Sequence, residues 1–152
     1  MTPPIALLRR LRTAATLLLL AACTAAQAAS YTMYRDPSCG CCKAWISHLQ
    51  ENGFSVTDHV EADMSAVKQR LGVPPRLASC HTGVIDGQFI EGHVPAADIL
   101  KLRKQPDLLG AAVPGMPTGS PGMEYGNVRD AYQVIGLDKQ GAEKIISDYP
   151  AN

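Results

Sequence analysis

The chain has 152 residues, with 14 basic and 14 acidic side chains and a formal net charge of zero. Three of the basic residues and none of the acidic residues lie in the first 28 positions, so the rest of the chain carries a formal charge of −3. This balance argues against a nucleic-acid partner, which would require a basic face. The 124 residues after position 28 are enough for one domain with one core.

Residues 1–28 have the pattern of an export signal. Three arginines within residues 9–12 precede an apolar run over residues 14–22, which is too short to span a bilayer. Ala-Gln-Ala at residues 26–28 fits a cleavage site. We therefore predict export to the periplasm.

A second interpretation of the same segment concerns Cys23. Residues 20–23, Leu-Ala-Ala-Cys, fit a lipobox in which Cys23 would carry the lipid of a membrane-anchored lipoprotein. We favour cleavage after Ala28, which leaves residues 29–152 as a single domain.

Strand and helix patterns alternate through most of this domain. They predict strands over residues 31–35 and 54–60, helices over residues 43–51 and 64–71, a tight hairpin of residues 82–85 and 88–90 around Asp86-Gly87, and a helix over residues 96–104 opened by Pro95. Asp63 is a suitable N-cap for the second helix, and Gly72 closes it. This β-α-β-α-β-β-α order predicts an α/β fold, a thioredoxin-like domain.

The C-terminal part of the chain differs in composition. Residues 109–126 hold five glycines, three prolines and the methionines Met116 and Met123, so we expect neither a regular helix nor a central strand there. Long loops of this kind are commonly functional or disordered. Residues 132–146 predict a closing hairpin, with a helix over residues 142–148 as the alternative for its second half.

Three cysteines crowd one predicted turn. Cys39 and Cys42 have the C-x-x-C spacing of a thiol–disulfide site just ahead of a helix, whose free N–H groups and positive end lower thiol pKa values. Cys41 between them is not needed for two-electron redox chemistry, and extra vicinal thiols invite oxidation. Structural disulfides, Cys39–Cys42 with Cys41–Cys80, are an alternative, but stapling is more effective when the closed loops are long.

The charge of four thiolates favours several copper ions. With Cys80 included the site carries four negative charges, of which one Zn(II) would neutralise two and one Cu(I) only one. Cys41 and Cys42 are adjacent and cannot easily fill two corners of one tetrahedron. About four Cu(I) ions bridged by thiolates would neutralise the site, and soft sulfur ligands select Cu(I). A thiol–disulfide oxidoreductase using Cys39 and Cys42, and a structural zinc module, stay open as alternatives.

Other soft or borderline donors lie along the chain. Cys80 would face the first helix in a thioredoxin-like domain, and His81 beside it suits a structural hydrogen bond as well as ligation. For His93, close to a helix start, a capping or structural role is favoured over ligation. Met116 and Met123 offer thioethers as ligands or as a lid, with core packing as the alternative.

Three separated segments resemble the small exported copper-resistance proteins of the CopG type, a family long known only as a domain of unknown function. These segments are YRDPSCGCCKAWISHL, LASCHTGVIDGQFIEGHVPAADI and GAAVPGMPTGSPGME. The resemblance implies a thioredoxin-like fold and a cysteine-bridged polynuclear Cu(I) cluster on Cys39, Cys41, Cys42 and Cys80. His81, His93, Met116 and Met123 lie in matching motifs.

The resemblance also implies a role in periplasmic copper detoxification. Copper ions, and other periplasmic copper-handling proteins, are the expected partners; a membrane is expected only if Cys23 is lipidated. Whether the protein is an enzyme that interconverts Cu(I) and Cu(II) stays open.

Overall fold

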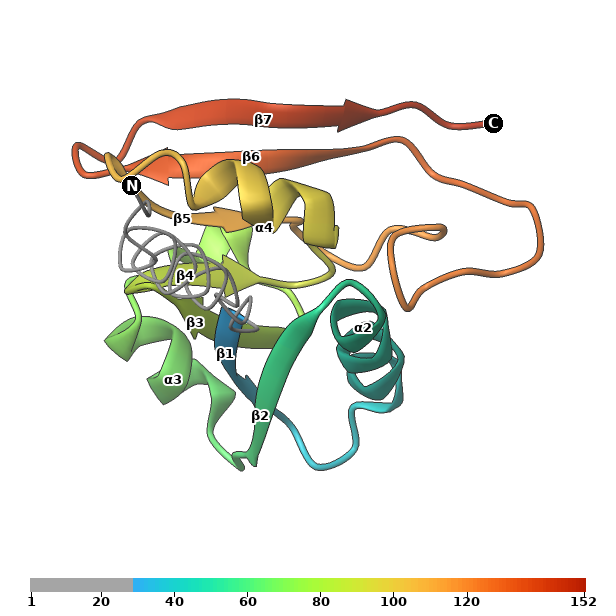
Figure 1. The fold of residues 1–152 in the computed structure, drawn as a ribbon, viewed down its shortest axis with the longest axis horizontal. Coiled ribbons are helices and arrows are strands. Elements are labelled where there is room, and N and C mark those ends of the chain that lie inside the picture. Colours follow the sequence, from blue (N-terminus) through green and yellow to red (C-terminus); the bar gives the residue numbers. More distant parts are fainter. Residues whose placement is uncertain (1–28) are drawn as a thin grey trace, which may run out of the picture.

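The structure is a computed structural model that describes residues 29–152. The predicted export signal, its cleavage site and the lipobox cysteine Cys23 lie outside the described residues. The described chain forms one seven-stranded mixed sheet with three α-helices (Figure 1), which confirms the predicted α/β class. None of these helices is long and apolar enough to cross a membrane.

The strands follow the order β2-β1-β3-β4-β5-β6-β7 across the sheet. They are β1 (Ala29–Arg35), β2 (Phe54–Val60), β3 (His81–Ile85), β4 (Gln88–Glu91), β5 (Leu108–Ala112), β6 (Tyr132–Asp138) and β7 (Glu143–Tyr149). The helices are α2 (Gly40–Glu51), α3 (Met64–Arg70) and α4 (Ala96–Leu102), with a short 3-10 helix, η1 (Pro75–Leu77). β1 pairs in parallel with β2 and β4 with β5, and the other neighbours are antiparallel.

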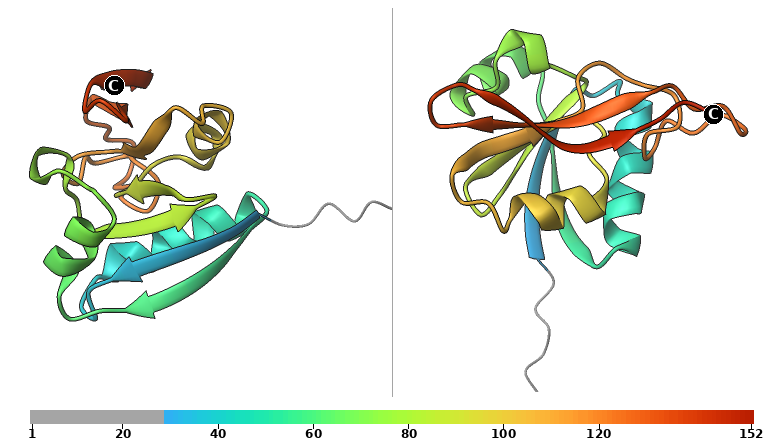
Figure 2. Two further views of the ribbon diagram at one scale, coloured as in Figure 1. Left: turned by 90° about the vertical axis from the view of Figure 1, so that its left-hand side faces the viewer. Right: turned by 90° about the horizontal axis from the view of Figure 1, so that it is seen from above.

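The helices cover both faces of the sheet (Figure 2). On one face α2 packs against β1, where the rings of Trp45 and Tyr31 meet edge to face at 5.4 Å between their centroids. Trp45 Nε1 donates a hydrogen bond of 3.0 Å to the carbonyl of Val94, which leads into α4. On the other face α3 lies over β1, with the Arg70 guanidinium 5.4 Å above the Tyr34 ring. Tyr31 and Trp45 are fully buried and belong to the same hydrophobic cluster as Cys42, against which Cys39 and Cys41 pack.

Several local predictions are confirmed. The Asp63 carboxylate accepts a hydrogen bond of 3.0 Å from Ala66 N at the start of α3. Asp86 and Gly87 both have positive φ angles, as the tight turn between β3 and β4 requires. β6 and β7 form the closing hairpin, so the helical alternative for residues 142–148 is wrong.

The prediction for the start of the C-terminal segment is wrong. Leu108–Ala112 forms β5, which lies between β4 and β6 and is therefore a central strand. Gly110 permits this pairing because a Cβ atom there would lie within 3.0 Å of the Phe89 ring and carbonyl oxygen on β4. A close approach between backbones is one of the uses of glycine in a strand. The prolines of the segment begin only after the strand has ended.

The first helix begins earlier than the predicted residue 43. α2 starts at Gly40 with Cys39 as its N-cap, so Cys41 and Cys42 lie inside the first helical turn. The last helix, α4, ends at Leu102, two residues before the predicted end at residue 104.

Candidate metal centre

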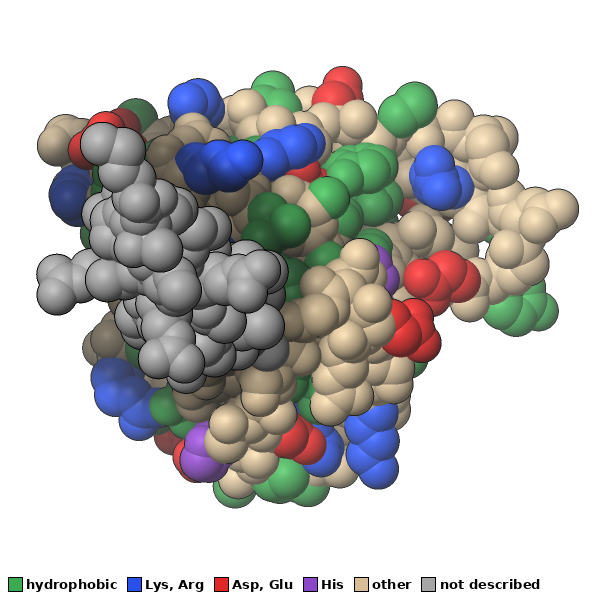
Figure 3. Space-filling model, viewed as in Figure 1, with side chains coloured by type: hydrophobic (Ala, Val, Ile, Leu, Met, Phe, Trp, Pro, Cys, Tyr) green, Lys and Arg blue, Asp and Glu red, His purple; other side chains and the backbone are tan. Residues whose placement is uncertain are grey.

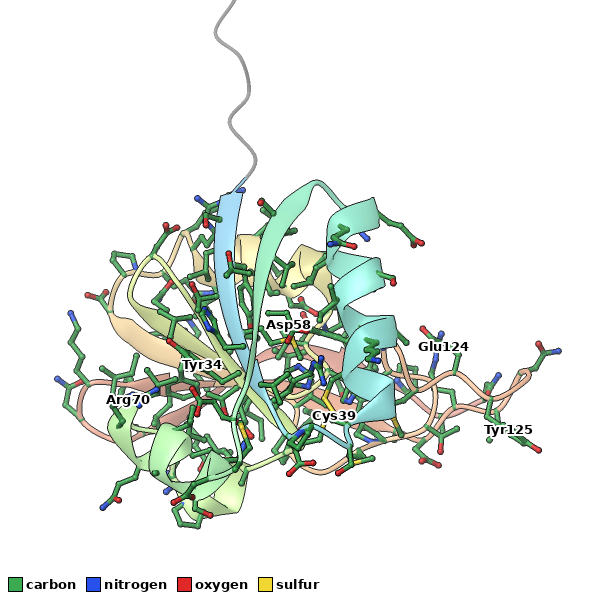
Figure 4. The ribbon with its side chains drawn as sticks, turned by 90° about the horizontal axis from the view of Figure 1, so that it is seen from below. Tyr34, Cys39, Asp58, Arg70, Glu124 and Tyr125 are labelled. Carbon is green, nitrogen blue, oxygen red and sulfur yellow. A yellow bond between two sulfur atoms is a disulfide. The ribbon has the colours of Figure 1, made fainter. Side chains whose placement is uncertain are left out.

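The cysteine motif is held by the turn that joins β1 to α2. Asp36 accepts a hydrogen bond of 2.8 Å from Ser38 N on its side chain and one of 3.1 Å from Cys39 N on its backbone carbonyl. Asx turns of this type are a common route into a helix. The turn places Cys39 at the N-terminal end of α2, where Figure 4 shows it beneath the first helical turn. Cys42 points into the core and is buried, whereas Cys39 and Cys41 are half-buried.

The structure brings all four predicted cysteines together. Their Sγ atoms lie within 4.8 Å of one another. Cys41 Sγ is 3.6 Å from Cys39 Sγ and 4.0 Å from Cys80 Sγ, and Cys42 Sγ is 3.9 Å from Cys80 Sγ. Cys80 therefore meets the motif from the loop that enters β3, as the sequence predicts.

Two of these sulfurs are joined. Cys39 and Cys42 form a disulfide across the C-x-x-C spacing. Within residues 29–152, Cys41 and Cys80 are free thiols. The site thus combines an oxidised pair with two thiols that stand beside it.

Two imidazoles reach the same sulfurs from the adjoining strands. His81, the first residue of β3, places Nδ1 3.2 Å from Cys80 Sγ and 3.5 Å from Cys42 Sγ. His93, which follows β4, places Nε2 3.1 Å from Cys80 Sγ. Both rings are fully buried, and the Trp45 ring lies 4.4 Å from the His81 ring between centroids. The His93 ring faces Cys80 as well as the Pro121 carbonyl, so its position suits ligation in addition to the structural role that the sequence favours.

The surroundings favour neutral side chains in the metal-free site. Burial lowers the pKa of His81 well below its usual value and also lowers the pKa of His93. Burial, with a contribution from Cys41, raises the pKa of the Cys80 thiol to about 12. The imidazoles therefore offer lone pairs near neutral pH, and a metal must displace the Cys80 proton to bind there.

Residues 113–131 lie over the open side of this cluster. His93 Nδ1 donates a hydrogen bond of 2.8 Å to the Pro121 carbonyl. Gly122, with a φ of +82°, sits against the start of α2, where a Cβ atom would lie 2.7 Å from Trp45 N. Met116 is half-exposed and lines an opening of about 450 Å³ together with Cys39, Cys41 and Cys80. Met123 lies in the same segment but not among the residues that line this opening.

A buried ion pair that the sequence analysis missed anchors the Cys80 segment. Glu91, fully buried on β4, accepts hydrogen bonds of 2.5 Å from Lys68 Nζ, 2.5 Å from Ser79 N and 2.6 Å from Thr82 Oγ1. Burial raises the pKa of Glu91, and Lys68 opposes that rise. Ser79 Oγ also donates to the Gly115 carbonyl, which ties the Cys80 segment to the loop carrying Met116.

The remaining histidines do not join the cluster. His48 accepts a hydrogen bond of 3.1 Å from Ala96 N at the start of α4, and exposed His59 stacks on Tyr34. On the face drawn in Figure 3, basic and acidic side chains are interspersed and form no continuous basic surface.

Comparison with known proteins identifies relatives. Residues 77–123 match the family described as "Protein of unknown function, DUF411". Two solved structures, of the copper resistance protein CopG in its form 2 and form 1, are each 66% identical to this chain. They cover 82% of it and are themselves covered to 100% and 99%, with TM-scores of 0.81 and 0.80. A search of curated proteins found no match. The chain therefore belongs to the same family as the copper resistance protein CopG.

Proposed function

We propose that this protein is a periplasmic copper-binding protein that holds Cu(I) in a cysteine-bridged polynuclear cluster and serves copper resistance or homeostasis. The observation that carries the proposal is the gathering of four cysteine Sγ atoms within 4.8 Å of one another. The family relatives named for copper resistance support the identity of the metal.

The sulfur geometry supports several ions better than one. Cys41 and Cys42 are consecutive residues, yet their Sγ atoms lie at nearly equal distances, 4.0 Å and 3.9 Å, from Cys80 Sγ. Thiolates at this spacing can be shared between neighbouring metal ions. Four thiolates in a half-buried site would be strongly unfavourable without compensating positive charge. About four monovalent soft ions would supply it.

The proposal requires the disulfide to open. Two electrons and two protons convert the Cys39–Cys42 disulfide into two thiols, and a dithiol of the compartment is a suitable reductant. Cu(I) then displaces the thiol protons as it binds. We include in the proposal a redox role at the same sulfurs, in which each Cu(I) that becomes Cu(II) gives one electron to a one-electron acceptor of the periplasm and regains it from a one-electron donor there. Other copper-handling proteins of the periplasm are the proposed partners.

The fold and the location belong to the same proposal. The arrangement of β1 to β4, with α2 and α4 on one face and α3 on the other, supports a thioredoxin-like domain. The sequence of residues 1–28 supports export. Mass spectrometry of the exported protein should give a chain that starts at Ala29. A chain that starts at a lipid-modified Cys23 would contradict this cleavage site and indicate a membrane-anchored lipoprotein.

A Cu(I) titration tests the proposed cluster. We expect the reduced, oxygen-free protein to take up several Cu(I) ions per chain, about four, in competition with a Cu(I) chelator. The single tryptophan, Trp45, should report the binding by fluorescence quenching, because its ring lies 4.4 Å from His81. Replacing Cys41 with serine removes a bridging sulfur and should lower the count, whereas Ser47→Ala on the exposed side of α2 should leave it unchanged. A count of one or less, the same in Cys41→Ser, would contradict the cluster.

A second function is favoured by the disulfide itself. The Cys39–Cys42 disulfide at a helix start is the arrangement of a thiol–disulfide oxidoreductase. Metal-free protein with this function would catalyse insulin reduction, and Cys39→Ser would abolish the turnover. The copper account instead expects no robust turnover, because Cys41 and Cys80 stand close enough to compete for the disulfide.

A further inference from the structure

The oxidised site retains a complete set of metal donors that includes neither disulfide sulfur. Cys80 Sγ, one nitrogen of His81 and one of His93 lie within 4.8 Å of one another. Their separations are 3.2 Å from Cys80 Sγ to His81 Nδ1 and 3.1 Å from Cys80 Sγ to His93 Nε2. Formation of the Cys39–Cys42 disulfide therefore removes two of the four cysteine thiolates but uses no donor of this second set.

The tautomer of His93 suits ligation. A carbonyl oxygen can only accept a hydrogen bond, so the 2.8 Å contact with the Pro121 carbonyl places the proton on Nδ1. The other nitrogen, Nε2, then carries the lone pair and faces Cys80 Sγ. A backbone carbonyl that orients an imidazole in this way is a usual second partner of metal-bound histidine.

The Cys80 and His81 donors are equally fixed in the disulfide form. Glu91 holds Ser79 N at 2.5 Å, and Gly92 N donates to the His81 carbonyl at 3.0 Å. The Trp45 ring packs on the His81 ring at 4.4 Å between centroids. The three donors come from segments at the ends of β3 and β4 that these contacts hold in place, so we expect little reorganisation on binding.

We infer that the disulfide form of the protein binds one divalent ion of borderline softness at Cys80, His81 and His93. One thiolate with two imidazoles suits Cu(II), Zn(II) or Co(II), whereas a set of four thiolates suits Cu(I). Because Cys80 belongs to both sets of ligands, a chain cannot hold the single divalent ion and the Cu(I) cluster at the same time. The protein would thus bind one divalent ion when Cys39 and Cys42 form the disulfide, and the Cu(I) ions of the proposed function, on which this step rests, when both are reduced. The single-ion site itself does not depend on how many Cu(I) ions the reduced form takes up.

Cobalt(II) is the probe of choice, because it reports its ligands by absorption and does not oxidise thiols. Oxygen-free protein of residues 29–152 with the disulfide closed, verified by a count of two free thiols, Cys41 and Cys80, should bind one Co(II) per chain with thiolate-to-metal charge-transfer absorption. His93→Gln should weaken binding at least about tenfold, and Cys80→Ser should abolish the charge-transfer band. The exposed variant His59→Gln is the matched control and should bind as the parent does.

The double variant Cys39→Ser/Cys42→Ser separates this site from the proposed cluster. It has neither the disulfide nor four thiolates, so it should bind one Co(II) with the same spectrum while its Cu(I) count falls. The inference is overturned if the oxidised protein binds no Co(II), or if the band survives in Cys80→Ser. It is also overturned if His93→Gln, shown by circular dichroism to be folded, binds Co(II) as tightly as the parent. None of these outcomes alters the Cu(I) count of the reduced parent protein, so the two proposals fail separately.

Discussion

Replacing Lys68 with methionine should lower the free energy of unfolding by about 3–5 kcal/mol. The Lys68 ammonium is the cation closest to the fully buried Glu91 carboxylate, at 2.5 Å, and its own side chain is only 16% exposed. Removing one partner of a buried ion pair leaves the other charge without compensation in a medium of low dielectric. Chemical denaturation of the oxidised, metal-free protein, monitored by far-UV circular dichroism, measures the change.

The double variant Lys68→Met/Glu91→Gln provides the control. The glutamine amide can accept the hydrogen bond from Ser79 N on its oxygen, and its NH2 group can donate to Thr82 Oγ1, which no longer accepts from Lys68. We therefore expect the double variant to recover more than half of the lost stability. Because Ser79 precedes Cys80, the single variant should also weaken metal binding at Cys80. Equal stabilities of Lys68→Met and the parent protein would show that the pair does not anchor this segment.

Replacing Gly110 with alanine should lower the free energy of unfolding by about 3 kcal/mol, the upper end of the usual cost of overpacking. The added Cβ atom would lie within 3.0 Å of the Phe89 carbonyl oxygen, which is backbone and cannot swing aside. Phe89 and Gly110 are partners in the parallel pairing of β4 and β5, so relief would require the two strands to separate. Thermal and denaturant unfolding would give the value.

Gly40→Ala is the matched control for Gly110→Ala. Gly40 lies in the first turn of α2, and no atom lies within 4 Å of its added Cβ position. Alanine is the better helix former by up to about 1 kcal/mol, so this variant should be as stable as the parent or more so. A tolerated alanine at position 110 would contradict the close β4–β5 packing described here.

Features of the fold that depend on neighbouring residues could be predicted from the sequence, whereas features that depend on contacts between distant residues could not. The β3–β4 turn and the Asp63 cap were predictable because each depends on a few neighbouring residues. β5 was not, because it opens a segment rich in glycine and proline, and the close contact of its one glycine, Gly110, with Phe89 depends on packing between residues distant in the chain. The start of α2 at Gly40 is not visible in the sequence, since cysteine and glycine are weak helix formers.

The same division holds at the candidate metal centre. The four cysteines could be grouped from spacing and strand order, because Cys80 enters β3 next to β1. The place of His93 beside Cys80 could not be predicted, because its ring orientation depends on the Pro121 carbonyl, which lies in a loop 28 residues later. Glu91 resembles an ordinary polar residue of a hairpin strand, and only the packing of α3 with Lys68 identifies it as a buried anchor.

X-ray absorption at the copper edge of the reduced, Cu(I)-loaded protein tests the central claim most directly. Thiolates that bridge several ions predict a first shell dominated by sulfur and, beyond it, scattering between copper atoms held close together by shared sulfurs. A spectrum with sulfur neighbours but no copper–copper scattering would instead describe isolated ions, and would contradict a cluster built on Cys39, Cys41, Cys42 and Cys80.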